Sequence, residues 1–162
     1  MPFTQDIAAT YRGPGKVVRR LVDAGQREDR ALAILMGACV ILFVAQWPRL
    51  SREAHLTGQD INGLLAGALA GWLLFAPLGF YLLSWLLHLI MRVFRGQGPS
   101  FNARIAIFWG LLAATPLALL NGLVAGFIGP GPALTLVGVV WIGVLLWFWI
   151  AGMRAVYRGD AA

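Results

Sequence analysis

The amino-acid sequence predicts an all-α membrane protein with four transmembrane helices and a preceding amphipathic interfacial helix. Three observations predict this class. Hydrophobic residues make up 59% of the 162-residue chain and charged residues only 12%, whereas soluble domains carry about 25% charged residues. The uncharged runs are long enough to cross a bilayer, which takes roughly 20 residues per helix. Lysine and arginine gather in every second connection, as they do in chains that cross a membrane repeatedly.

The segment before the first span is expected to hold the amphipathic helix. In the stretch GPGKVVRRLVDAGQ, Pro14 stands near a helix start and Gly25 near its end. Valine and leucine side chains fall on one face, and Lys16, Arg19 and Arg20 lie off it. This pattern predicts a helix in the membrane interface with its basic groups at anionic headgroups. The helix either anchors the chain or serves as a docking surface for a partner or a specific lipid.

Three uncharged runs predict where the chain crosses the membrane. Ala31–Trp47 has the length of one short span, and Ile61–Met91 is too long for one upright span but too short for two. Ile105–Met153 fits two spans, because the prolines and glycines of GFIGPGPALT favour a reversal between them. The predicted division is a cytoplasmic N-terminal segment (1–29), a transmembrane domain (30–155) with helices at about 30–48, 61–94, 103–128 and 132–155, and a cytoplasmic tail (156–162).

The basic residues indicate which side of the membrane each connection occupies. Lysine and arginine favour the cytoplasmic side. With four spans, eleven of the thirteen basic residues fall on one side, and only Arg49 and Arg52 fall on the other. An odd number of spans would mix the two groups. We therefore expect both termini to lie in the cytoplasm.

The connection FRGQGPSFNAR, residues 94–104, interrupts the apolar sequence with glycines and arginines. It is not a nucleotide-binding loop of the Walker type, because it lacks the Lys-Ser/Thr pair and no strand precedes it. We expect a cytoplasmic connection in which Ser100 caps the next helix and the arginines attract phosphate or carboxylate groups. The residues predicted to contact lipid or a partner on this face are Lys16, Arg19, Arg20, His88, Arg92, Arg95 and Arg104.

Small residues predict how the helices pack. Glycine recurs at four-residue steps in the second and third spans, and this spacing lets helix backbones approach closely. Asn121 is expected to hydrogen-bond to another helix, and Thr115, before Pro116, to satisfy a backbone carbonyl at a kink. Packing within the chain is favoured over packing between two copies. The residues predicted for helix packing are Gly63, Gly67, Gly71, Gly122, Gly126 and Asn121.

The sequence offers no arrangement of catalytic residues. His55 and His88 are its only histidines, and no Asp, Glu, Lys or Arg lies in the core of a predicted span. One histidine without a second ligand is not a metal site, and proton or ion transfer usually depends on buried ionisable groups. We therefore expect no enzymatic activity, no metal, no cofactor and no nucleic-acid partner.

The sequence from His88 onward, HLIMRVFRGQGPSFNARIAIFWGLLAATPLALLNGLVAGFIGPGPALTLVGVVWIGVLLWFWIAGMRAV, resembles the bacterial branch of the Yip family, the Ypt/Rab-GTPase-interacting membrane proteins. Such proteins have a short Gly-rich basic loop, a Ser-Phe pair, a span with a central proline and a span with a tryptophan. In this chain, TYRGPGKVVRRLV also resembles the family's Pro-containing segment before the first span. The residues that carry the likeness are Gly96, Gly98, Ser100, Phe101, Pro116 and Trp141.

The resemblance implies a helical protein of the bacterial inner membrane with a cytoplasmic N-terminus. The usual family pattern has five spans, whereas four are predicted here, and the resemblance brings no active-site residue. The function expected first is a non-catalytic scaffold or membrane-organising protein that contacts lipids and other membrane proteins or itself. A small accessory subunit of a larger inner-membrane, energy-transducing complex is the alternative, and a small transporter comes third.

Overall fold

The computed structural model describes residues 3–158, and within them the chain is helical, with no strand. This confirms the predicted fold class, an all-α membrane protein. The helices are α1 (Phe3–Thr10), α2 (Pro14–Asp23), α3 (Glu28–Thr57), α4 (Ile61–Ala70), the π-helical turn η1 (Gly71–Phe75), α5 (Ala76–Val93), α6 (Ser100–Ala113), α7 (Thr115–Phe127) and α8 (Pro132–Tyr157).

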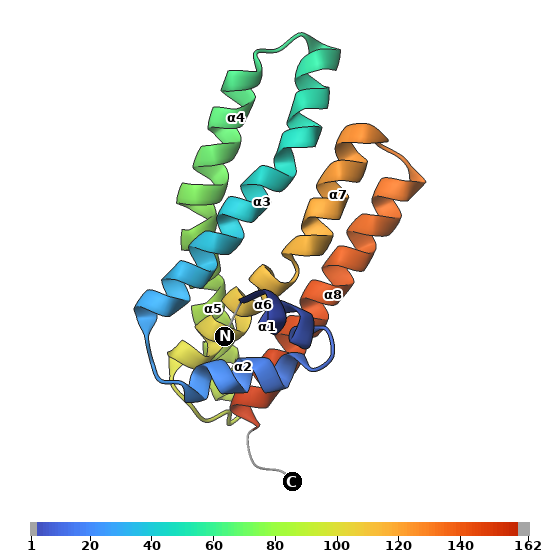
Figure 1. Ribbon diagram of the computed structural model, residues 1–162. Helices are drawn as coiled ribbons and strands as arrows, with labels where there is room; N and C mark the ends of the chain where they lie inside the picture. Colours follow the sequence, from blue (N-terminus) through green and yellow to red (C-terminus); the bar gives the residue numbers. More distant parts are fainter. Residues whose placement is uncertain (1–2, 159–162) are drawn as a thin grey trace.

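Three helical stretches are long and apolar enough to cross a bilayer, namely α3, the continuous run from α4 to α5, and α8. The α6–α7 pair, bent by 43°, supplies a fourth if it is counted as one span. Figure 1 shows α3 beside α4 and α7 beside α8, with α6 inside one end of the molecule and the short α1 and α2 lying across that end. Because α6 contacts α1, α2, α3, α5 and α8, it lies at the centre of the core.

The bend between α6 and α7 forms at the predicted proline. Pro116 has no N–H, so the carbonyl of Leu112 loses the donor that an unbroken α-helix would supply. The Thr115 hydroxyl donates to that carbonyl at 2.7 Å, which confirms the predicted role of Thr115. Below the bend α6 is buried on nearly all sides, and the indole N–H of its Trp109 donates to the Thr10 hydroxyl of α1 at 2.9 Å.

Two helices run further than a simple span requires. α3 continues through Pro48 to Thr57 and ends where Gly58 adopts the left-handed conformation (φ 71°), with its N–H bonded to the Ala54 carbonyl. A proline removes only one hydrogen bond from the ladder, so the residues after it can still be helical. The α4–α5 run is continuous, and its π turn, in which the Ala76 N–H reaches the Gly71 carbonyl, comes directly before Pro77.

The glycines of α7 lie directly against the backbone of α3. A Cβ atom built on Gly122 would overlap the Ala45 carbonyl oxygen of α3. A Cβ on Gly126 would lie 2.6 Å from the Pro48 carbonyl carbon. Glycine is therefore what lets α7 cross α3 so closely.

The prediction that Gly63, Gly67 and Gly71 pack within the chain is wrong, because a Cβ atom on any of them would meet nothing within 4 Å. None of the residues of α4 is fully buried, so its glycine face points away from α3. The spacing alone could not show this, because it is the same whether a face meets a neighbouring helix or the surroundings. Packing of this face between two copies stays a prediction.

The expectation that Asn121 hydrogen-bonds to another helix is wrong. Among the described residues, Asn121 Oδ1 is buried without a hydrogen-bond partner, and the α8 residue Gly138, whose built Cβ would lie 3.5 Å from this oxygen, has no side chain to donate. The predicted amphipathic helix forms as α2, and its apolar face packs on the protein. Val17 and Val18 are buried in the protein core, where Val18 lies against Gly152 of α8.

Candidate functional site

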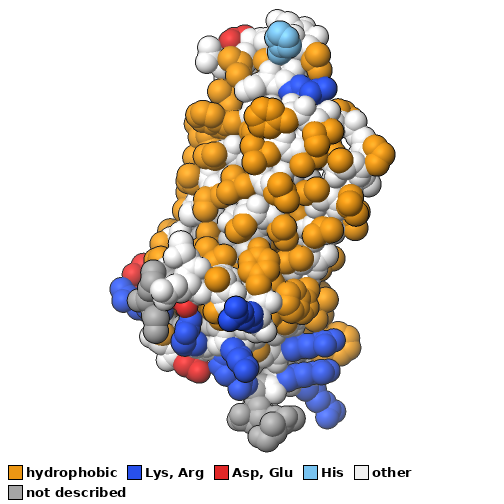
Figure 2. All heavy atoms as spheres, turned by 45° about the vertical axis from the view of Figure 1, so that its right-hand side comes forward, with side chains coloured by type: hydrophobic (Ala, Val, Ile, Leu, Met, Phe, Trp, Pro, Cys, Tyr) orange, Lys and Arg blue, Asp and Glu red, His pale blue; other side chains and the backbone are white. Residues whose placement is uncertain are grey.

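The basic residues gather at one end of the molecule. α2, the start of α3, the end of α5, the start of α6 and the end of α8 meet there (Figure 1). All lysines and arginines except Arg49 and Arg52 belong to these segments or adjoin them. Figure 2 shows lysine and arginine side chains clustered at this end below a band of hydrophobic side chains. We call it the basic end.

α1 and α2 are fixed to the basic end by specific contacts. The Tyr11 hydroxyl between them donates to the Ala113 carbonyl of α6 at 2.7 Å, and burial raises the pKa of Tyr11 above its ordinary value. Arg20 of α2 forms an ion pair with Asp6 of α1. A Cβ on Gly15 would lie 3.0 Å from the Ala155 Cβ of α8. These contacts place the polar face of α2 beside the last turns of α8.

Four of the seven side chains predicted to contact lipid or a partner have partners within the chain. Arg19 Nη2 donates to the Ala155 carbonyl at 2.9 Å, and Arg20 pairs with Asp6. Arg104 Nη2 donates to Glu28 Oε1 at 2.6 Å and joins α6 to α3. His88 Nδ1 and the Tyr157 hydroxyl share a hydrogen bond that joins α5 to α8. Sequence shows the charge of each residue but not which neighbour the fold places beside it.

The other three predicted contact residues, Lys16, Arg92 and Arg95, are exposed. Within the described part of the chain, no side-chain hydrogen bond or ion pair involves them. Arg95 adopts a positive φ of 62° where the chain leaves α5. The Gly96 N–H then bonds to the Met91 carbonyl at 2.7 Å.

Ser100 does not cap α6 as predicted. The helix begins at Ser100 itself, so Pro99 occupies the N-cap position, where no side-chain cap hydrogen bond forms. The Ser100 hydroxyl instead accepts a hydrogen bond of 3.1 Å from Arg104 Nη2. Pro99 itself has an extended backbone, with φ −74° and ψ 160°.

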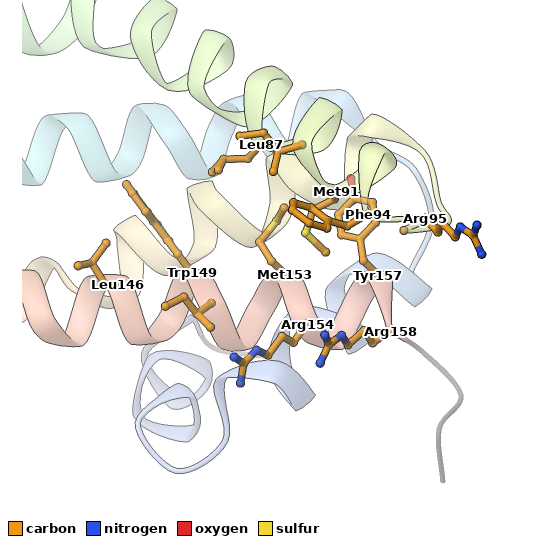
Figure 3. A pocket seen from close by; sticks show the side chains of 13 residues that line it. Leu87, Met91, Phe94, Arg95, Leu146, Trp149, Met153, Arg154, Tyr157 and Arg158 are labelled. Atoms are coloured by element: carbon orange, nitrogen blue, oxygen red, sulfur yellow. The ribbon is translucent and has the colours of Figure 1, made fainter.

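An apolar groove opens between the ends of α5 and α8. Its volume is about 550 Å³, and Figure 3 shows its side chains between the two helices. We call it the α5/α8 groove. Its apolar walls include Leu87, Met91 and Phe94 from the α5 side and Trp149, Met153 and Tyr157 from α8. Arg95, Arg154 and Arg158 also line the groove, and Figure 3 shows the side chains of Arg154 and Arg158 extending from α8 away from α5.

A second and smaller depression, which we call the basic crevice, separates α2 from the end of α8. It is lined by Lys16 and Arg19 of α2, by Arg154 and Arg158 at the end of α8, and by Gly15 and Ala155 where the helices touch. Arg154 and Arg158 line the groove as well as the crevice, so the two depressions adjoin.

Sequence reasoning did not include Arg154 and Arg158 among the contact residues. Their four-residue spacing at a helix end was a usable signal, because it places both on one helix face. The spacing could not show that α2 lies beside that face with two more cations.

The chemistry available at this end is attraction of anions beside an apolar surface. Arginine remains protonated at physiological pH and offers several N–H donors, so it binds phosphate or carboxylate but does not act as a base. Within residues 3–158, no group of three or more His, Cys, Asp or Glu side chains could hold a metal ion.

Comparison with known protein families agrees with this architecture. The Yip1 domain matches residues 8–161, nearly the whole chain. The chain belongs to the Yip family. Comparison with curated proteins and with solved structures gives no match. The Yip1 domain confirms the family resemblance seen in the sequence and makes this a multi-pass membrane protein of a family not known for enzymatic activity. The Yip-family assignment and the apolar helices also support contact with membrane lipids.

Proposed function

We propose that this Yip-family protein is a non-catalytic scaffold or membrane-organising protein of the bacterial inner membrane. The observation that carries the proposal is the basic end, where exposed cations surround an apolar groove. Such a surface attracts anionic headgroups and acidic partner segments without catalysing a reaction. Lysine and arginine favour the cytoplasmic side, so the basic end would face the cytoplasm, with both termini on that side.

The proposed membrane placement follows the same charges. Residues 30–155 would form the transmembrane domain, with a cytoplasmic segment at 1–29 and a cytoplasmic tail at 156–162. The α3–α4 turn and the last turns of α3, which carry Arg49 and Arg52, would lie on the opposite side. At that end, Arg52 Nη1 donates to the Gly126 carbonyl of α7 at 3.3 Å. One of the two basic groups on that side is therefore engaged within the protein.

A second candidate function is an accessory subunit of a larger inner-membrane, energy-transducing complex. The open glycine face of α4 favours it. A Cβ atom added to Gly63, Gly67 or Gly71 would meet no neighbouring atom of the described chain within 4 Å, and small residues at this spacing allow another helix to approach closely. A subunit would bury this face against a partner, whereas a scaffold could leave it to lipid or to a second copy.

Purification tests the two candidates. The tagged chain is first crosslinked in the membrane and then extracted in a mild detergent. The co-purifying proteins are identified and quantified. A stoichiometric large complex, disrupted by Gly67→Leu and not by the matched Gly37→Leu, would favour the subunit. Gly37 is a suitable control because a Cβ there also meets no atom within 4 Å, but it lies on α3. A small homogeneous species with bound lipid would favour the scaffold. Recovery of a monomer without lipid or protein would contradict both.

A further inference from the structure

We propose that the basic crevice and the α5/α8 groove together form one binding site for an anionic phospholipid. The phosphate would lie among Lys16, Arg19, Arg154 and Arg158, and one acyl chain would lie along the groove. The inference rests on the proposed function, because it assigns a defined ligand and a defined position to the lipid contacts of the basic end.

The four cations of the crevice lack compensation within the described chain. Each is exposed, and no ion pair among residues 3–158 involves any of them. Like charges held close together repel one another, and a bound anion relieves this repulsion. The crevice therefore favours a negatively charged ligand over a neutral one.

Two features hold the crevice in shape before a ligand binds. Arg19 Nη2 is bonded to the Ala155 carbonyl at 2.9 Å, which fixes its guanidinium group over the last turn of α8 and leaves other N–H groups free for an anion. Gly15 has only Ala151 and Ala155 opposite it, with a built Cβ 3.3 Å from the Ala151 carbonyl oxygen. A larger residue at this position would push α2, and with it Lys16 and Arg19, away from α8.

The adjoining groove indicates that the anion belongs to a lipid. From Leu146 to Arg158 the groove follows α8 over twelve helical steps, which is about 18 Å at 1.5 Å per residue. One leaflet of the hydrocarbon core is about 15 Å thick, half of roughly 30 Å. A phosphate bound at Arg154 and Arg158 would thus place an acyl chain against Trp149 and Met153 (Figure 3). A soluble phosphate or an acidic peptide would leave this apolar surface open.

The test titrates the purified full-length protein with phosphatidylglycerol and with phosphatidylcholine and follows binding by native mass spectrometry. We expect the wild type to prefer phosphatidylglycerol. Arg154→Gln/Arg158→Gln should bind phosphatidylglycerol about 25-fold more weakly, because each basic group near the headgroup contributes about a factor of five. Arg12→Gln/Arg27→Gln is the matched control, since it removes two exposed charges from the same end outside the crevice and should change binding little.

Two further measurements distinguish a lipid from other anions. Soluble glycerol phosphate, added at the concentration of the lipid, should not displace phosphatidylglycerol. A phosphatidylglycerol with a photoreactive acyl chain should crosslink to residues 87–96 and 146–158. Equal weakening of both double variants, displacement by glycerol phosphate or crosslinks elsewhere would overturn the site. The proposed function is tested separately: if partner capture succeeds while these measurements fail, the scaffold stands and the lipid site falls.

Discussion

The crossing of α7 and α3 allows a quantitative test of the fold with a single methyl group. A Cβ at Gly122 would overlap the Ala45 carbonyl oxygen and would lie 2.9 Å from its carbonyl carbon. Optimal carbon contacts are about 3.5–4.0 Å, so the helices would have to separate by about 1 Å at this point. The atom it meets belongs to the backbone, so no side chain can move aside to make room.

The change Gly122→Ala should therefore destabilise the protein. Overpacking costs about 1–3 kcal/mol, and the higher helix propensity of alanine offsets at most about 1 kcal/mol. Gly67→Ala is the matched control, because its methyl group would meet nothing within 4 Å and only the propensity gain remains. We expect the two variants to differ by about 2 kcal/mol in their free energy of unfolding.

The measurement is reversible unfolding of the full-length protein in mild detergent, followed by circular dichroism, with thermal unfolding as a second readout. Gly122→Ala should have the lower stability and Gly67→Ala the stability of the wild type or slightly more. If Gly122→Ala is as stable as Gly67→Ala, then α7 does not cross α3 at Gly122 as the structure has it, and the packing argument is wrong.

Three further predictions test other contacts. A reporter that is active only in the periplasm should be inactive when fused after the last residue and active when inserted at Gly58; the opposite pattern would reverse the proposed orientation. Arg104→Gln should destabilise the protein by about 0.2–1 kcal/mol through loss of the Glu28 ion pair, whereas Arg95→Gln should leave stability unchanged, as measured by detergent unfolding; equal effects would count against the α6–α3 tether. Tyr11→Phe should cost about 1 kcal/mol at neutral pH through loss of the bond to Ala113. Because the pKa of Tyr11 is raised in the folded state, this difference should persist below pH 10 and shrink as the pH rises through the folded pKa; a difference independent of pH up to strong alkali would show that the hydroxyl is not the cause.

Sequence reasoning succeeded where the chemistry of a short stretch decides the outcome. The uncharged runs predicted the apolar helices, because a bilayer accepts only helices with few charges. Pro116 predicted the bend before α7, and Thr115 satisfies the carbonyl that it frees. The amphipathic pattern predicted the helix α2, although the structure shows that its apolar face packs on the protein.

Sequence reasoning failed where two stretches far apart in the chain meet. Gly122 and Gly67 carry the same small-residue pattern, yet only Gly122 lies against another helix. Arg104 and Arg95 belong to the same connection, yet only Arg104 has a carboxylate, Glu28, beside it. No local pattern distinguishes the members of these pairs.

The sequence by itself determined the fold class, the apolar helices, the concentration of basic residues at one end of each hairpin and the membership of the Yip family. Only the tertiary structure decided which glycines pack, which arginines are paired, and that α2 and α8 join four cations in one crevice beside an apolar groove. The physical reason is that periodicity shows which residues share a helix face, whereas the neighbour of that face depends on how helices far apart in the chain cross one another.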